Sequence, residues 1–128
     1  MSVYAFNDNL EKVQIITLTG TKTIPAGDFG VITWDSSALA SAGVDTNNLA
    51  NYAILDVMYT YGSSQDYWYS GTNAGYVSSS PTSGYPDQIH PAPYVTIDTY
   101  SKQISVADYS GDNTAQSKTY KVRLIKVA

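Results

Sequence analysis

The chain has 128 residues, no cysteine and a formal net charge of −4, with a sequence pI of about 4.5. This length suits one domain that buries its own core. The lack of cysteine excludes a disulfide framework, thiolate chemistry and a Cys-based metal site. The acidic balance argues against non-specific nucleic-acid binding, which needs a basic face to release phosphate counterions. No apolar run approaches the roughly 18 to 20 residues of a membrane span, so we expect no nucleic-acid or membrane partner.

Only 14% of the residues are charged, while Gly, Ser, Thr, Asn and Tyr abound. A polar, weakly charged surface favours an extracellular or virion-exposed β protein over a cytosolic helical enzyme. We divide the chain into an N-terminal arm, residues 1–12, and one β-sandwich domain, residues 13–128. The arm carries two aromatics, Tyr4 and Phe6, and is interpreted either as a docking arm or as a frayed terminus with one ring folded back. It lacks the basic start and apolar core of a signal peptide.

The first strands are predicted from β-branched runs and turn residues. Val13–Leu18 forms the first strand, and Gly20 together with residues 23–27 forms a turn, in which Pro25 presets φ and a glycine permits positive φ. Phe29–Trp34 is the second strand, with the Trp34 ring in the core.

The segment 35–50 is the one part of the chain that the sequence predicts to be helical. Asp35 or Ser36 caps a short helix over Ala38–Ala42, and Gly43 ends it. Because an isolated helix of this length is marginal, we expect one or two turns packed across an end of the sandwich.

Asn51–Tyr61 is predicted to be the central strand. Its odd positions are apolar or aromatic, and on the other face Ile54 and Met58 surround one acidic residue, Asp56, so both faces are expected to be largely covered. The long segment that follows, residues 62–93, is expected to carry function or short strands of its own. We place such strands at Tyr67–Tyr69 and Ala74–Val77.

The C-terminal third reads as a hairpin and a closing strand. Tyr94–Thr99 and Gln103–Ala107 alternate and pair through a short turn. Lys118–Val127 is the last strand, with Tyr120, Val122 and Leu124 on one face. The parity slips at Ile125, which predicts either a bulge or a strand end buried on both faces. The fold class is therefore all-β, an antiparallel, jelly-roll-like β-sandwich with at most one short helix.

The sequence contains no strong catalytic motif. We therefore expect that the protein is not an enzyme and that it binds no cofactor and no metal. The one histidine, His90, precedes a proline and is interpreted as a turn residue, and no second histidine exists to complete a zinc site. No G-x-S-x-G elbow, G-x-G-x-x-G or phosphate loop is present. Asp66 and Asp87 flank the tyrosine-rich segment and are the one candidate for the paired carboxylates of a glycosidase, an interpretation that we rank below binding. Calcium needs only aspartates and carbonyls, but no EF-hand spacing occurs.

The more specific signal is a cluster of aromatic residues interleaved with Gly, Ser, Asn and Asp. Its members, which we predict to bind a ligand or partner, are Tyr59, Tyr61, Tyr67, Trp68, Tyr69, Tyr76 and Tyr85. Tyrosine and tryptophan give large contact area with few rotors and a polar tip. Sugars stack on such rings, and Gln65, Asp66 or Asn73 can bond their hydroxyls. Surface recognition, a subunit interface and plain core packing remain the three interpretations.

Four of the seven basic residues fall in the last strand. They are Lys118, Lys121, Arg123 and Lys126. We interpret them as a stripe that protects a sheet edge; the alternative is pairing with acidic residues of a neighbouring subunit.

Three stretches give the chain a family resemblance. They are V-x-I-I-x-L-x-G-x-x-x-I-P-A-G at residues 13–27, the strand YAILDVMYTY, and the closing YKVRLIKV. With them, residues 13–128 resemble the small β-sandwich domains of tailed-bacteriophage virion surface proteins. The resemblance implies a capsid decoration or head-fibre protein, a homotrimer, and a capsid-docking arm that carries Tyr4 and Phe6. The major capsid protein or another virion protein would be its partner.

From the same resemblance we expect a location on the virion surface after synthesis in the host cytoplasm. The leading hypothesis is therefore a non-enzymatic virion structural protein. The alternative is a carbohydrate- or receptor-binding module, as at a tail-fibre tip, that binds a host surface glycan through the tyrosine-rich loop. A glycan hydrolase ranks third.

Overall fold

The computed structural model of the chain describes residues 4–6, 12–61, 65–70, 93–109 and 115–127, and of residues 61 and 65–70 the backbone alone. In chain order its elements are β1 (Tyr4–Phe6), β2 (Lys12–Ile24), β3 (Phe29–Trp34), α1 (Ser36–Ser41), the 3-10 helix η1 (Thr46–Asn51), β4 (Tyr52–Tyr61), β5 (Gln65–Ser70), β6 (Tyr94–Asp98), β7 (Gln103–Tyr109) and β8 (Gln116–Lys126).

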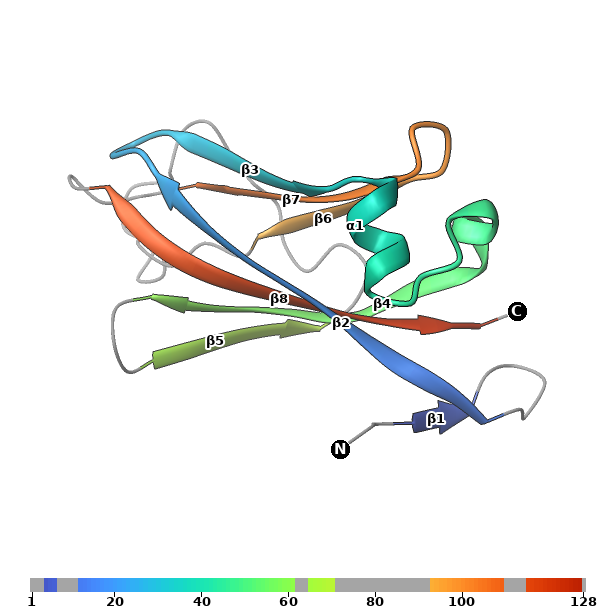
Figure 1. The fold of residues 1–128 in the computed structure, drawn as a ribbon. Helices are drawn as coiled ribbons and strands as arrows, with labels where there is room; N and C mark the ends of the chain where they lie inside the picture. The colour runs from blue at the N-terminus through green and yellow to red at the C-terminus, as the bar shows by residue number, and fades with distance from the viewer. Residues whose placement is uncertain (1–3, 7–11, 62–64, 71–92, 110–114, 128) are drawn as a thin grey trace.

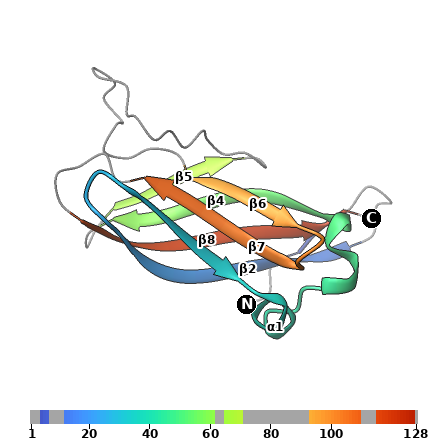
Figure 2. The same cartoon turned by 90° about the horizontal axis from the view of Figure 1, so that it is seen from above.

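The strands form two antiparallel sheets that face each other. One sheet has the order β1-β2-β8-β4-β5 and the other β3-β7-β6. Figures 1 and 2 show the larger sheet curling beneath the smaller one, with β2 crossing diagonally from one to the other. The predicted all-β antiparallel sandwich is confirmed, and most of the strands lie where the alternation placed them.

The first predicted strand is longer than expected. β2 runs unbroken through Gly20, so the predicted turn at this glycine is wrong. A Cβ on Gly20 would lie 2.3 Å from Ile32 Cδ1 in the opposite sheet, so the glycine permits the close approach of β2 to β3. The turn after β2 is where the proline and glycine placed it: Gly27 has φ 61°, and the Asp28 amide donates to the Pro25 carbonyl at 3.2 Å.

The predicted helix is confirmed together with its cap. The Asp35 carboxylate accepts from the Ala38 amide at 2.8 Å, and Gly43 follows the helix with φ 94°. Leu39 of α1 and Leu49 of η1 are buried in the core. Figure 1 shows both helical segments at one end of the sandwich, between the two sheets, so they close that end against water.

β4 is an inner strand, as predicted, but its alternation breaks at Leu55. The register moves from Ile54 opposite Leu124 to Asp56 opposite Arg123, which leaves Leu55 as an extra residue, a β-bulge. The inward face of β4 therefore uses Ile54 before the bulge and odd-numbered residues after it. The slip predicted within the last strand is resolved as burial on both faces, because Leu124 and Ile125 are both buried.

The core is filled from both sheets and from the helical segments. The Trp34 side chain lies in it, as predicted, and its indole N–H donates to the Thr19 carbonyl at 3.2 Å. The β6–β7 hairpin is also confirmed. The core cluster comprises Leu18, Trp34, Leu39, Val44, Leu49, Tyr52, Ile54, Val57, Tyr59, Val95, Ile104, Val106, Tyr120, Val122 and Leu124.

Candidate functional site

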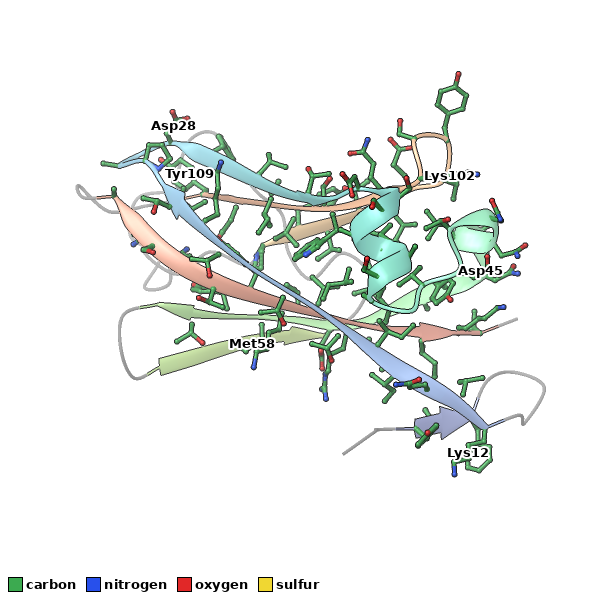
Figure 3. All side chains as sticks on the ribbon, viewed as in Figure 1. Lys12, Asp28, Asp45, Met58, Lys102 and Tyr109 are labelled. Carbon is green, nitrogen blue, oxygen red and sulfur yellow. The ribbon has the colours of Figure 1, made fainter. Side chains whose placement is uncertain are left out.

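The N-terminal arm contains a short edge strand that displays both of its aromatic side chains. Tyr4 is 51% exposed and Phe6 is 68% exposed. β1 pairs antiparallel with Lys12–Gln14, at the end of β2 that projects beyond the smaller sheet (Figure 1). The Lys12 Nζ lies 4.5 Å from the centroid of the Tyr4 ring, a cation–π contact, and Figure 3 labels Lys12 at this end of the molecule.

β1 has one neighbour, β2, and no other described strand pairs with its outer edge. An open edge presents unpaired backbone groups and can accept a further strand. Exposed aromatic rings beside such an edge give a partner apolar area to bury. The arm thus offers two features of an interaction surface, a strand edge that no described strand pairs with and two apolar anchors.

The aromatic segment after β4 begins with β5, which lies at the other edge of the larger sheet among the described strands. β5 continues the five-stranded sheet by pairing with β4, which places Trp68 opposite Met58 and Tyr67 opposite Tyr59. The predicted strand over Tyr67–Tyr69 is confirmed. The remaining predicted positions of this cluster lie outside the described residues, namely Asn73, Tyr76, Tyr85, Asp87 and His90, as does the predicted strand Ala74–Val77. The proposed pairing of Asp66 with Asp87 therefore stays a prediction.

Tyr59, the first residue of the predicted binding cluster, is a core residue. Its side chain is 0% exposed, and its ring lies 5.9 Å from that of Tyr120, centroid to centroid. A ligand on the surface cannot reach it in this conformation, so its assignment to a ligand-binding surface is wrong. The physical reason is the bulge at Leu55, together with strand alternation, which turns Tyr59 toward the opposite sheet.

The basic stripe does not protect an edge. β8 is a central strand, paired with β2 on one side and β4 on the other, so the edge-protection prediction is wrong. Its four basic residues also differ in position. Lys121 is exposed and Arg123 and Lys126 are half-buried, whereas Lys118 is 0% exposed and points between the sheets.

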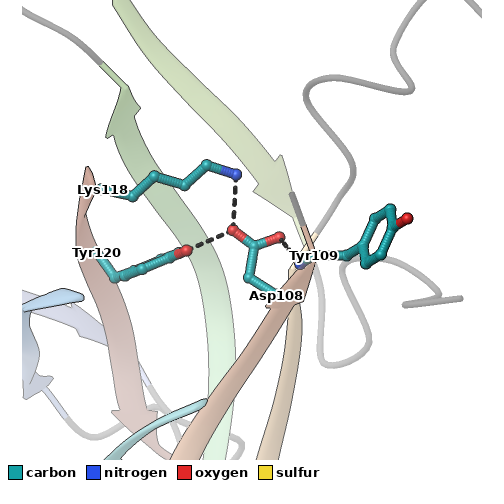
Figure 4. Close-up of polar contacts among 4 residues, drawn as sticks. All are labelled: Asp108, Tyr109, Lys118 and Tyr120. Atoms are coloured by element: carbon teal, nitrogen blue, oxygen red, sulfur yellow. Dashed lines mark hydrogen bonds and ion pairs between the residues drawn. The ribbon is translucent and has the colours of Figure 1, made fainter. Parts of the chain in front are cut away.

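Lys118 belongs to a buried polar cluster with Asp108 and Tyr120 (Figure 4). The Lys118 Nζ donates to the Asp108 Oδ2 at 3.0 Å, and the Tyr120 hydroxyl donates to the same oxygen. The Asp108 Oδ1 accepts from the Tyr109 amide at 2.8 Å. All three side chains of the cluster are buried. Since β7 belongs to one sheet and β8 to the other, the cluster links the two layers.

Burial shifts the pKa values of Lys118 and Tyr120 in this cluster. Desolvation lowers the pKa of Lys118, and the nearby Asp108 carboxylate opposes that shift. Desolvation, reinforced by the Asp108 charge, raises the pKa of Tyr120 far above its usual value, so its hydroxyl keeps its proton. The Lys118 Nζ also lies 4.2 Å from the centroid of the Tyr59 ring, which covers it from one side.

The sequence contained a signal for this cluster. Lys118 has the same parity as Tyr120, Val122 and Leu124, which identifies it as an inward-facing lysine in an apolar alternation. A buried lysine requires an anionic partner. The partner was not identifiable, because Asp108 lies on another strand and is one of several aspartates near turns.

The far end of β8 carries two further ion pairs. The Arg123 Nε donates to the Asp56 Oδ1 at 2.8 Å, and the Arg123 Nη2 donates to the Asp56 Oδ2, so the pair is bidentate. This hydrogen bonding raises the pKa of Arg123. The Lys126 Nζ lies 3.7 Å from the Asp45 Oδ2, with both side chains 39% exposed.

Within the described ranges, no group of three or more His, Cys, Asp or Glu side chains could hold a metal ion. The helices of this part of the chain are too short and too polar to cross a membrane. Comparison of the chain with protein-family models, with curated proteins and with solved structures finds no match. Any assignment of function therefore has to come from the geometry of the residues themselves and from the resemblance noted in the sequence.

Proposed function

We propose that the chain is a non-enzymatic structural protein of a phage virion, a capsid decoration or head-fibre protein that assembles as a homotrimer and docks through β1. The observation that carries the proposal is the exposure of Phe6 and Tyr4 on an edge strand. The location on a virion rests on the family resemblance of residues 13–128. The major capsid protein or another virion protein is then the surface on which β1 docks.

The shortness of β1 supports a docking role. A strand of three residues, held by one neighbour, gains little from its own sheet. A partner that buries both rings and pairs with the open edge supplies the missing stabilisation. Aromatic anchors of this kind dominate the binding energy of protein interfaces.

Two measurements test this function. Light scattering behind size exclusion gives the oligomeric mass, and cosedimentation with purified capsids of the encoding virus gives docking. For the double variant Tyr4→Ser/Phe6→Ser, we expect capsid affinity to fall by at least about tenfold, as for loss of interface anchors. The trimer should persist, because the arm docks on the capsid rather than on the other subunits.

The matched control is Tyr100→Ser, which removes a 96% exposed tyrosine from the β6–β7 turn of the other sheet. This variant should bind capsids like the unmodified protein. Equal binding by the arm variant and the control, or a clean monomer, would contradict the proposal.

A carbohydrate- or receptor-binding module is the second candidate. It is favoured by the position of β5, an edge strand whose sequence contains Tyr67, Trp68 and Tyr69 in succession. A glycan-binding screen decides between the two functions. Loss of a glycan signal in Trp68→Ala, with the signal kept in Tyr100→Ala, would favour this module over the virion protein.

A further inference from the structure

The buried cluster brings a primary amine and a carboxyl group into contact between the two sheets. Asp108 is near the end of β7 and Lys118 is near the start of β8, and their side chains meet at 3.0 Å with no exposed surface on either residue. Figure 4 shows the two side chains extending toward each other from separate strands. The chain has no cysteine, so no disulfide can join these layers.

We propose that Lys118 and Asp108 condense to an intramolecular isopeptide bond that covalently joins the two sheets of the sandwich. The reaction makes an amide from the Lys118 Nζ and the Asp108 Cγ and releases one water. It needs no oxidant, reductant, nucleotide or metal. The inference does not depend on the function proposed above, because the bond forms within one folded chain.

Burial favours this reaction in two ways. A low-dielectric site favours the neutral form of the Lys118 amine, and it is the neutral amine that has a free electron pair. The lowered pKa of Lys118 agrees with this preference. The fold also holds the two groups together, which replaces a bimolecular encounter with an oriented unimolecular step. The ring of Tyr59, 4.2 Å from the Nζ at its centroid, keeps water from that side.

The contacts around Asp108 supply the remaining catalytic groups. The Tyr109 amide donates to Oδ1, the oxygen that bears negative charge when the carbonyl is attacked. The Tyr120 hydroxyl donates to Oδ2, the oxygen that must leave as water. The carboxyl group is thus held with different donors on its two oxygens, as an addition–elimination requires.

The Lys118 amine condenses with the Asp108 carboxyl group by addition and elimination. A proton passes from the Lys118 Nζ to the Asp108 Oδ2, which gives the neutral amine and acid. The Nζ electron pair adds to Cγ, and the C=Oδ1 π pair moves to Oδ1. The nitrogen then loses a proton, which the Tyr120 hydroxyl relays to Oδ2. The C–Oδ2 bond breaks, its electrons leave with the oxygen as water, and the Oδ1 pair restores the carbonyl.

Intact-mass spectrometry of the purified full chain, denatured just before measurement, tests the proposal. The expected mass is below the sequence mass by about 18 Da, one water. Lys118→Arg keeps the positive charge but replaces the amine with a non-nucleophilic guanidinium, so it should show its full sequence mass. Lys121→Met, which removes an exposed lysine of the same strand, should retain the loss of water. Proteolysis should release a branched peptide that contains residues of β7 and β8.

Asp108→Asn gives an independent check, because an asparagine at this position can still condense with Lys118. Condensation of an asparagine side chain releases ammonia, about 17 Da, and yields the same amide as the aspartate. The cross-linked variant and the cross-linked unmodified chain should therefore have identical masses. Tyr120→Phe should slow formation of the bond by at least about tenfold, the lower range for loss of a proton-transfer group, while Tyr52→Phe at the other end of the sandwich should not.

The result that overturns the proposal is a folded protein whose mass equals its sequence mass after prolonged incubation at neutral pH. Folding is verified on the same sample by circular dichroism. In that case the Lys118–Asp108 contact is an ion pair and nothing more. A loss of water that persists in Lys118→Arg would also overturn it, because the dehydrated residue would then lie elsewhere.

Discussion

The two ends of β8 carry the same residue types in opposite environments. At its start, Lys118 is sealed between the sheets with Asp108 and Tyr120. Toward its end, Arg123 and Lys126 meet Asp56 and Asp45 with 39% of each basic side chain exposed. The difference arises from strand parity and from the curvature of the sheet, which decide whether a basic residue faces the opposite layer or solvent.

The comparison shows that charge alone does not predict the energetic role of a residue. A buried pair is costly to form, but once it is formed, removal of one partner leaves an uncompensated charge in low dielectric. An exposed pair exchanges one hydrated arrangement for another and is screened by salt. We therefore expect large effects from substitutions at the start of β8 and small effects at its end.

Lys118→Met should have the largest effect. It removes the Lys118 amine, and with it the ion pair of the uncondensed chain or the amide of the condensed one, so the Asp108 carboxyl group is buried without a partner. We expect a loss of about 3–5 kcal/mol in the free energy of unfolding. Urea denaturation measures this loss. Lys121→Met, an exposed position of the same strand, is the control and should change stability by less than about 0.5 kcal/mol. Similar urea midpoints for Lys118→Met and Lys121→Met would show that the buried lysine contributes no more to stability than the exposed one.

Tyr120→Phe should come second. Measured in a Lys118→Arg background, where no amide can form, it deletes one hydroxyl that donates to the buried Asp108 carboxylate, and hydrogen bonds to charged groups are worth about 1.5–3 kcal/mol. The variant to compare with it is Tyr52→Phe. The Tyr52 hydroxyl accepts a hydrogen bond from the uncharged backbone amide of Asp45 at 2.9 Å. We expect this neutral bond to contribute about 0.5–1.5 kcal/mol. The same urea assay compares them, and a larger loss in Tyr52→Phe would contradict the order.

Arg123→Met should cost less than about 1 kcal/mol, because 39% of the Arg123 side chain is exposed to solvent even though its geometry is bidentate. The cost should shrink in high salt, which screens the exposed pair but not the buried one. Denaturation at low and high ionic strength tests both statements. A loss above about 2 kcal/mol that is independent of salt would mean that this end of β8 behaves like the buried start.

The smallest effect is expected in acid, at Asp45. The main cause that lowers the pKa of Asp45 below 3.8 is the hydrogen bond that the Asn48 side-chain Nδ2 donates to its Oδ2 at 2.7 Å, and Lys126 makes a lesser contribution. Because the folded-state pKa is the lower one, the contribution of Asp45 to stability is present above pH 3.8 and is lost as the pH falls from there through the folded-state pKa. Thermal melts between about pH 2 and 5 should show a weaker acid dependence in Asn48→Ala than in Lys126→Met. A weaker acid dependence in Lys126→Met than in Asn48→Ala would mean that the ion pair with Lys126 is the main cause of the lowered pKa of Asp45.

The sequence by itself determined the fold class and most of the local structure. Apolar residues at every second position define the strands, as in Phe29–Trp34, because a strand turns alternate side chains to opposite faces. Asp35 and Gly43 delimit the helix, because a side chain satisfies its first amides and a glycine adopts positive φ at its end. These effects depend only on residues that are close in sequence, so they can be predicted from the sequence alone.

Only the tertiary structure decided which strands are neighbours. The inner position of β8, the bulge at Leu55 and the burial of Tyr59 all depend on register between strands distant in sequence. The meeting of Lys118 with Asp108 depends on how the two sheets face each other. Periodicity reports which side of a strand is apolar, but it carries no information about the partner. The partner is selected by the packing of the whole sandwich, in which shifting one strand by a single residue would reverse every side chain on it.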